Sequence, residues 1–335
     1  MEQERNPRAA SEQARQEIVG IDVAKAKLDV ALKQPKGKWK TKVVDNTCAG
    51  FEQLRAWLAK HGISCAHVCM EATGIYWERV AEDLADHGFA VSVVNPAQIK
   101  DFGGAKGVRT KTDAVDAKLI ADFCEGQNPP VWKAPSKSIR RLRALVGRRD
   151  ALIDLRTQEK CRLEVATTEE VRRSIEQVIA HLEQQIAEIE RQIKSDIDDD
   201  PTLREQRDLL KTIPGIGDTT AALFLSHYGG ELRFDKTRQA VAFAGLDTAK
   251  HESGTSVRGR PRMSKMGHTA IRKAVYMPAV TAMSRTLWGK AFSSRLLAAG
   301  KPKKLVLGAL MRKIVAIAYG VLKSGMPFNP AFHAA

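Results

Sequence analysis

Apolar residues in the first 130 positions fall into two kinds of pattern. Short runs rich in valine, isoleucine and leucine, which favour strands, occupy residues 17–32, 38–46, 66–73 and 90–96. A turn between Asp22 and Lys27 divides the first of these runs into two strands. Amphipathic stretches that favour helices occupy residues 50–62, 75–87 and 111–124.

The order of these elements indicates a fold class. Three strands in a meander, followed by alternating helices and strands, is the order of an RNase H-like α/β domain. We expect this domain to occupy residues 18–130 and to end near Pro129 and Pro130. The polar segment over residues 1–17 is predicted to be a flexible N-terminus.

Residues 131–200 show a different, helical pattern. Isoleucine and leucine recur at alternating spacings of four and three between Ile175 and Ile193, which is typical of a coiled-coil seam. An intramolecular hairpin with the arginine-rich helix near 136–165 fits the same pattern, and the sequence does not choose between the two. We therefore assign this region as a helical or coiled-coil linker that serves oligomerisation, and expect its helix to break at Pro201.

Residues 201–335 are predicted to form a mainly helical C-terminal domain. Gly215 and Gly217 lie between two helical patterns, where glycines allow a sharp turn and backbone N–H groups can face a phosphate. This pattern indicates a helix-hairpin-helix motif that binds nucleic acid, although a corner that only packs two helices has the same pattern. Further helices are expected near 268–298 and 303–324.

Basic residues are concentrated at the C-terminal end. The 335 residues include 54 lysines and arginines against 39 aspartates and glutamates, which gives a formal net charge of +15. Fifteen of these basic residues follow Glu252, and no acidic residue does. Such a segment favours a polyanion partner, nucleic acid above all, because neutralised phosphates release counterions. A basic surface that only promotes solubility is the alternative.

The cysteines and the N-terminus bear on localisation. Five cysteines without a C-x-x-C pair favour a reduced, cytoplasmic protein without structural zinc. The first 17 residues lack an apolar signal-peptide core, and we expect no membrane association.

Four acids stand out in the first domain: Asp22, Glu71, Asp113 and Asp116. The first two are expected at strand ends, and the other two are three residues apart on one helix face. Carboxylates that converge in this way repel one another unless a cation neutralises them. Mg²⁺ suits such oxygen ligands, and two ions about 4 Å apart can act on both oxygens of a phosphodiester exchange.

The chain resembles the DEDD transposases of bacterial insertion sequences over almost its whole length. The segments that carry the resemblance are "VGIDVAKAKLDVAL", "MEATGIYWERVAEDLADHGFAVSVVNP", "TKTDAVDAKLIADF", "IPGIGDTTAALFL" and "GTSVRGRPRMSKMGHTAIRKAVY". That family includes site-specific DNA invertases and recombinases guided by a bridge RNA. The resemblance implies a RuvC-like N-terminal domain in which Asp22, Glu71, Asp113 and Asp116 bind magnesium.

The same resemblance implies a nucleophilic serine in the C-terminal domain. In the family this serine precedes an SK-x-G sequence, attacks a DNA phosphate and forms a covalent phosphoserine link. Here Ser264 to Gly267 supply that sequence, Ser253 lies at the matching place, and Ser256 is the alternative. The basic residues expected to hold nucleic acid nearby are Arg258, Arg260, Arg262, Lys265, Arg272 and Lys273.

Together these observations favour a DNA recombinase whose serine and carboxylates come from different domains. Donor and target DNA are the expected partners, and the resemblance adds a noncoding bridge RNA and a dimer that becomes a tetramer. Two alternatives remain open. A metal-dependent nuclease or junction resolvase would use the carboxylates alone, and a non-catalytic nucleic-acid-binding protein would use neither.

Overall fold

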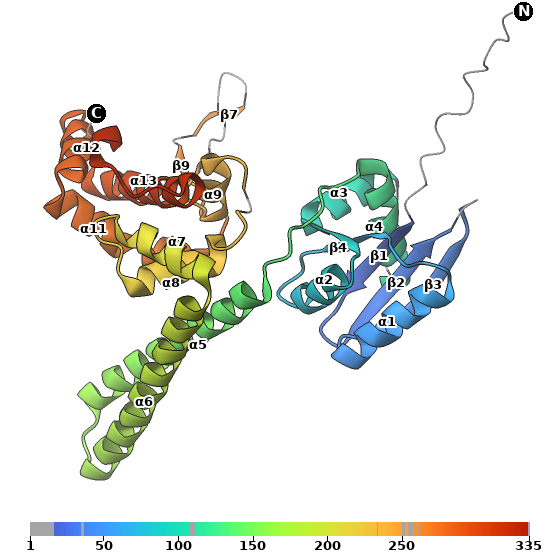
Figure 1. Ribbon diagram of the computed structural model, residues 1–335, viewed down its shortest axis with the longest axis horizontal. Coiled ribbons are helices and arrows are strands. Elements are labelled where there is room, and N and C mark those ends of the chain that lie inside the picture. The colour runs from blue at the N-terminus through green and yellow to red at the C-terminus, as the bar shows by residue number, and fades with distance from the viewer. Residues whose placement is uncertain are drawn as a thin grey trace, which may run out of the picture. The chain divides into compact units, whose positions relative to one another are not determined.

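The chain divides into two compact units, Met1–Ala134 and Pro135–Ala335, in the computed structural model (Figure 1). The structure describes residues 17–34, 37–107, 112–232, 234–249, 252–253, 257–259 and 261–333. The long helices of the 131–200 region belong to the second unit. Each unit is described by itself below.

The first unit is built on a five-stranded mixed sheet. Its strands are β1 (Ile18–Val23), β2 (Lys27–Lys33), β3 (Trp39–Asp45), β4 (His67–Glu71) and β5 (Ala90–Val94). Their order in the sheet is β3-β2-β1-β4-β5, with β1 to β3 antiparallel and β4 and β5 parallel to β1. This is the RNase H-like arrangement, so the predicted fold class is confirmed for this unit.

Helices cover both faces of that sheet. Helices α1 (Cys48–Lys60) and α2 (Trp77–Asp86) share one apolar core with the sheet, and α3 (Pro96–Ala105) and α4 (Asp113–Gln127) share another. The predicted helices at 50–62, 75–87 and 111–124 correspond to α1, α2 and α4. Helix α3 was not predicted, although Asn95 and Gln98 form a capping box at its start and Pro96 is its first residue.

A glycine lets α4 lie directly on the sheet. Gly20 faces α4 from β1, and a Cβ atom built on it would lie 2.1 Å from the carbonyl oxygen of Ala117. Ala31 pairs with Gly20 on β2, so the sheet offers two small residues at this contact. The close packing brings the first turn of α4 near the end of β1, where Asp22 lies.

The second unit begins with a long helical hairpin. Helices α5 (Lys137–Val165) and α6 (Glu169–Asp199) pack along each other, and Leu152 of α5 forms an apolar cluster with Leu182 and Ile186 of α6. Part of the predicted coiled-coil seam is thus used within the chain. Helix α6 ends before Asp200, whose side chain caps α7 (Pro201–Lys211), so the predicted break at Pro201 is confirmed.

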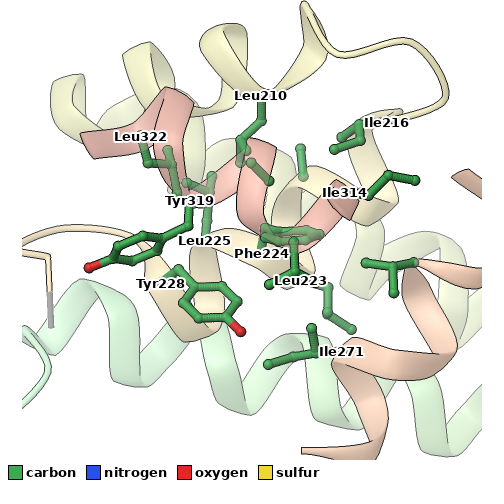
Figure 2. Close-up of a cluster of buried hydrophobic side chains, with 14 of the residues drawn as sticks. Leu210, Ile216, Leu223, Phe224, Leu225, Tyr228, Ile271, Ile314, Tyr319 and Leu322 are labelled. Atoms are coloured by element: carbon green, nitrogen blue, oxygen red, sulfur yellow. The ribbon is translucent and has the colours of Figure 1, made fainter. Parts of the chain in front are cut away.

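The remaining helices form one apolar core. They are α8 (Asp218–Tyr228), α9 (Thr237–Phe243), α10 (Thr269–Ala274), α11 (Tyr276–Arg285), α12 (Leu287–Ala298) and α13 (Lys303–Ser324), followed by a 3₁₀ turn at Pro330–His333. Figure 2 shows side chains of α8 and α13 packed against one another, and the Tyr228 and Tyr319 ring centroids lie 5.8 Å apart. The mainly helical C-terminal region is confirmed. Helix α13 has the length and hydropathy of a membrane span, and half of its apolar window is buried inside this unit.

Two short strand pairs form a small β-ribbon in the second unit. The outer pair is β6 (Thr248–Ala249) with β9 (Arg262–Met263), and the inner pair is β7 (Glu252–Ser253) with β8 (Val257–Arg258). Two-residue strands lie below the length at which an apolar and polar alternation becomes visible, so the sequence carried no signal for them.

Candidate functional site

The four predicted acids lie at one end of the sheet in the first unit. Asp22 is on β1, and Glu71 ends the adjacent parallel strand β4, one position beyond the Ile21–Met70 pair. Asp113 and Asp116 occupy the first turn of α4, whose N-terminus Thr112 caps by accepting a hydrogen bond from Val115 N at 3.4 Å. Acidic side chains are favourable in a first turn because the helix dipole is positive there.

Electrostatic coupling shows that these side chains are neighbours. Burial, and then the charges of Glu71, Asp116, Asp113 and Asp29, raise the pKa of Asp22 to about 6. A raised carboxyl pKa means that the ionised form is destabilised where it lies. A cation at this end of the sheet would relieve that repulsion, because it would favour the ionised form of Asp22.

Two further residues belong to the cluster: Asp29, a comparable carboxylate that the sequence-based prediction left out, and Lys27, which it did not consider. Asp29 lies directly opposite Asp22 in the β1–β2 hairpin and is buried. The Nζ atom of Lys27 lies 3.0 Å from a carboxylate oxygen of Asp29 and 2.6 Å from one of Asp113. The register of the β1–β2 hairpin could have identified Asp29 from the sequence. If the chain turns at residues 24–26, the two strands pair so that residues 22 and 29 lie opposite each other.

The carboxylate oxygens of the four acids are suitable ligands for a hard cation, but the side chains do not converge on one point. Carboxylate oxygens are the ligands that Mg²⁺ prefers. Within the described residues, however, no three histidine, cysteine, aspartate or glutamate side chains gather closely enough to hold a metal ion. The carboxylates interact through their charges without enclosing one point, and Asp113 is held by Lys27.

The predicted nucleophile lies in the second unit, on the β-ribbon. Ser253 is the last residue of β7 and pairs with Val257, while Arg258 pairs with Glu252. For Ser253 and Arg258 only the backbone is described. The alternative serine, Ser256, and Arg260 lie outside the described residues.

The base of the ribbon is fixed by polar contacts. Ser264 donates its hydroxyl hydrogen to the carboxylate of Asp247, and its amide donates to the carbonyl oxygen of Asp247 at 3.0 Å. Arg272 donates to the carbonyl oxygens of Ala244 at 2.9 Å and Gly267 at 3.0 Å, and so joins the two feet of the ribbon. The predicted contact residue Arg272 therefore has a structural task within the chain.

Two other predicted contacts, Arg262 and Lys265, have exposed side chains at this base. Arg262 opens β9, where it pairs with Ala249. Lys265 has a left-handed backbone with φ of 55° and lies in the turn between β9 and α10. Both cations are placed where a phosphate backbone could reach them.

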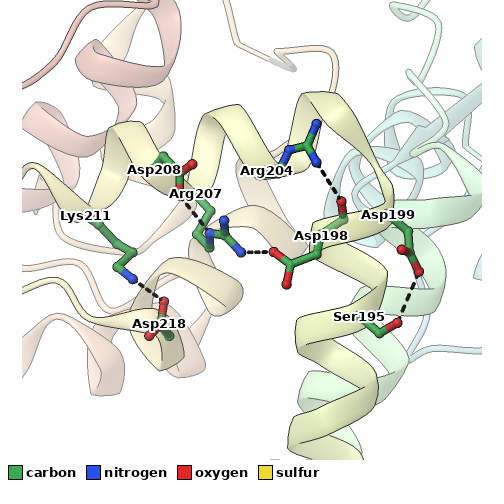
Figure 3. Close-up of polar contacts among 8 residues, drawn as sticks. All are labelled: Ser195, Asp198, Asp199, Arg204, Arg207, Asp208, Lys211 and Asp218. Atoms are coloured by element: carbon green, nitrogen blue, oxygen red, sulfur yellow. Dashed lines mark hydrogen bonds and ion pairs between the residues drawn. The ribbon is translucent and has the colours of Figure 1, made fainter.

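The glycines between α7 and α8 serve packing in part. Gly215 has φ of +94°, and a Cβ atom on it would lie 3.2 Å from Cα of Pro278 in α11. Gly217 precedes α8 and has open space at its Cβ position. Lys211 and Asp218 form an ion pair of 2.7 Å across this turn, beside the pair between Arg207 and Asp198 (Figure 3).

A cavity of about 750 Å³ borders this turn in the second unit. Helices α5, α6, α7, α8 and α10 line it. Lys273, the last predicted contact, is one of the lining residues and lies 3.1 Å from Asp154 of α5. Several basic side chains that line the cavity, Lys273 among them, form ion pairs with carboxylates of the same unit.

Comparison with known proteins identifies the family. Residues 19–171 match a family described as transposase, and residues 207–294 match the transposase IS116/IS110/IS902 family. The pilin gene-inverting proteins of Moraxella bovis and Moraxella lacunata are each 33% identical over 318 residues, which is 94% of this chain and 98% of theirs. An uncharacterized 43.6 kDa protein of insertion element IS110 from Streptomyces coelicolor is 26% identical over 117 residues, 35% of this chain and 29% of its own length.

Among solved structures, the RuvC of Thermus thermophilus is 16% identical, with a TM-score of 0.25, over 35% of this chain and 99% of its own. The two family matches and the pilin gene-inverting relatives show that the protein is a transposase-type enzyme that cuts and rejoins DNA. The chain belongs to the IS110 family of transposases, whose curated relatives include DNA-inverting proteins.

Proposed function

We propose that this enzyme is the site-specific recombinase of an insertion sequence and that it works through a covalent phosphoserine intermediate. The observation that carries the proposal is the cluster of Asp22, Glu71, Asp113 and Asp116, whose mutual repulsion calls for a cation. The basic ribbon that holds Ser253 is the second half of the proposed site.

The exchange starts when the oxygen of Ser253 attacks a DNA phosphorus. A bond forms between that oxygen and phosphorus, the bond to one deoxyribose oxygen breaks, and the serine proton leaves with a base or water. Because the phosphoserine keeps the energy of the phosphodiester, a deoxyribose hydroxyl can later reverse the attack on a new strand. Arg258, Arg260, Arg262 and Lys265 would hold the phosphates on either side.

Magnesium is proposed for the carboxylate cluster. Asp22, Glu71, Asp113 and Asp116 would hold it, and it would neutralise negative charge that develops on the phosphate. No acidic residue follows Glu252, so Ser253 and the residues after it include no carboxylate for this task. We propose that the carboxylates come from the first unit of the same or another subunit, once DNA has assembled the complex.

Partners beyond DNA are proposed on two grounds. The family resemblance implies a bridge RNA that pairs with donor and target DNA, and a formal net charge of +15 suits a protein that binds backbones while base pairing reads the sequence. Four exchanged strands require several nucleophiles, which favours a dimer that becomes a tetramer. Like its substrates, the enzyme is expected in the bacterial cytoplasm, associated with the nucleoid.

The test uses Ser253→Ala and Ser256→Ala in the full-length protein with donor and target DNA. We expect Ser253→Ala to lose covalent protein–DNA adducts and recombination while binding is retained, and Ser256→Ala to keep both. A junction resolvase that uses the carboxylates alone would still cleave after the Ser253→Ala change. Adducts that persist in Ser253→Ala and vanish in Ser256→Ala would assign the attack to Ser256.

A further inference from the structure

Lys27 places a positive charge inside the carboxylate cluster. It begins β2, and its Nζ atom bridges Asp29 of the sheet, at 3.0 Å, and Asp113 of α4, at 2.6 Å. A lysine side chain is an ammonium at physiological pH, so both contacts are ion pairs. The side chain thus links the sheet to the first turn of the helix that carries two of the four acids.

The charge of the cluster explains why an internal cation is useful. The charges of four other carboxylates, those of Glu71, Asp116, Asp113 and Asp29, act on Asp22 here. Without a counter-charge this end of the domain would be destabilised by their repulsion. Lys27 compensates part of that charge in the protein alone.

The same bridge is easily broken. Side chains of Lys27 and Asp113 are 42% and 56% exposed, and ion pairs this exposed are weak. A divalent cation carries twice the charge and binds carboxylate oxygens directly. The positive charge of Lys27 beside Oδ2 of Asp113 disfavours a second cation on the same carboxylate, so the two cations compete.

We infer that Lys27 is a built-in counter-cation, which holds Asp113 while the metal is absent and releases it when a divalent ion binds. The inference rests on the metal site of the proposed function and assigns a task to a residue outside the four acids. It also accounts for the open arrangement of the cluster, in which Asp113 is turned to an ammonium rather than to the other acids. Metal binding would then rearrange the first turn of α4.

The test is a calorimetric titration of the full-length protein, without nucleic acid, with Mg²⁺ and with Mn²⁺. Lys27→Met and Lys27→Gln remove the competing charge, and we expect each to bind the metal about five-fold more tightly than the wild type. Lys27→Arg keeps a cation and should bind like the wild type. Lys25→Met, in the exposed turn before β2, removes the same charge outside the bridge and should change affinity by less than about two-fold.

A second measurement follows thermal unfolding without metal. Lys27→Met and Lys27→Gln should melt below the wild type in EDTA and show the larger rise in melting temperature when Mn²⁺ is added. Equal affinities in wild type and both variants, or weaker binding by the variants, would overturn the inference, the latter because Lys27 would then position Asp113 for the metal. If even the wild type binds no divalent ion, the metal part of the proposed function fails first.

Discussion

Single residues decide how the carboxylate cluster behaves. Asp22, Glu71, Asp113 and Asp116 were recognisable in the sequence because they follow apolar runs or share a helix face. Lys27 and Asp29 were not, since their meaning depends on the hairpin register that brings Asp29 opposite Asp22. A buried carboxylate beside four others is a property of the folded chain and leaves no mark in the local pattern.

Asp22 provides a prediction at this scale. Its pKa of about 6 lies above the ordinary value of about 3.9, so the folded protein alone takes up this proton between pH 6 and pH 4. The destabilisation that burial and the neighbouring charges cause at ionised Asp22 is thus fully present above pH 6 and disappears as the pH falls towards 4. In EDTA, Asp22→Asn should raise the free energy of unfolding by about 1 kcal/mol at pH 8, after allowance for solvent screening, and by little at pH 4.

Urea unfolding at both pH values measures this difference. Asp45→Asn, on β3, removes an acid that does not act on Asp22 and serves as the control. A gain of equal size at pH 4 and pH 8 would mean that the amide stabilises by some route other than relief of charge. With metal present the order should reverse, because the amide is a poorer ligand than the carboxylate.

Helices and strands of this protein differ in how readily they can be predicted from the sequence. The five strands and the helices α1, α2, α4, α5 and α6 have periodic apolar residues over several turns or pairs, and the prediction found them. Helix α3 buries only Ile99 and Gly103, and the ribbon strands have two residues each. Their formation depends on caps and on contacts with distant residues, such as those of Arg272, which periodicity does not record.

The contact between β1 and α4 positions the carboxylate cluster. Adding a single Cβ atom at Gly20 tests this contact. A Cβ atom on Gly20 would lie 2.1 Å from Ala117 O and 2.5 Å from Ala121 N, which forces the helix off the sheet. We expect Gly20→Ala to reduce the free energy of unfolding by about 1–3 kcal/mol and to weaken metal binding as α4 shifts.

Gly126→Ala is the matched control within the same helix. Its Cβ atom has open space, and alanine favours a helix over glycine by up to about 1 kcal/mol. This variant should be as stable as the wild type or more so. If Gly20→Ala proved equally stable in urea unfolding, α4 would not need the close approach that the structure gives it.

For the whole molecule, charge and helical surface point to assembly. The acidic cluster lies in one unit and the basic, acid-free segment in the other, a division that the sequence shows by composition alone. The sequence left a coiled-coil seam and an intramolecular hairpin as alternatives for α6, and the structure shows α6 packed against α5 in a hairpin. Leu182, Ile186 and Ile193 are buried, whereas Val171 and Val178, one heptad apart towards the hairpin tip, are 49% and 44% exposed.

That exposed stripe is where a second protomer is expected. Leu155 and Val165 of α5 add exposed apolar surface to the same hairpin, and apolar stripes left open on a helix favour association. Changing Val171 and Val178 together to aspartate places two charges in the expected interface, which should weaken self-association at least ten-fold. The fold should persist, because neither side chain is part of a buried core.

Light scattering coupled to size-exclusion chromatography, over a range of protein concentrations, follows the change from dimer to monomer. Val43→Asp introduces the same charge at a side chain that is 55% exposed on β3 and should leave the mass unchanged. Recombination should fall with dimerisation in the double variant, since the proposed mechanism takes its several serines from paired protomers. A double variant that stays dimeric would move the interface away from the hairpin, and recombination without any dimer would remove assembly from the mechanism.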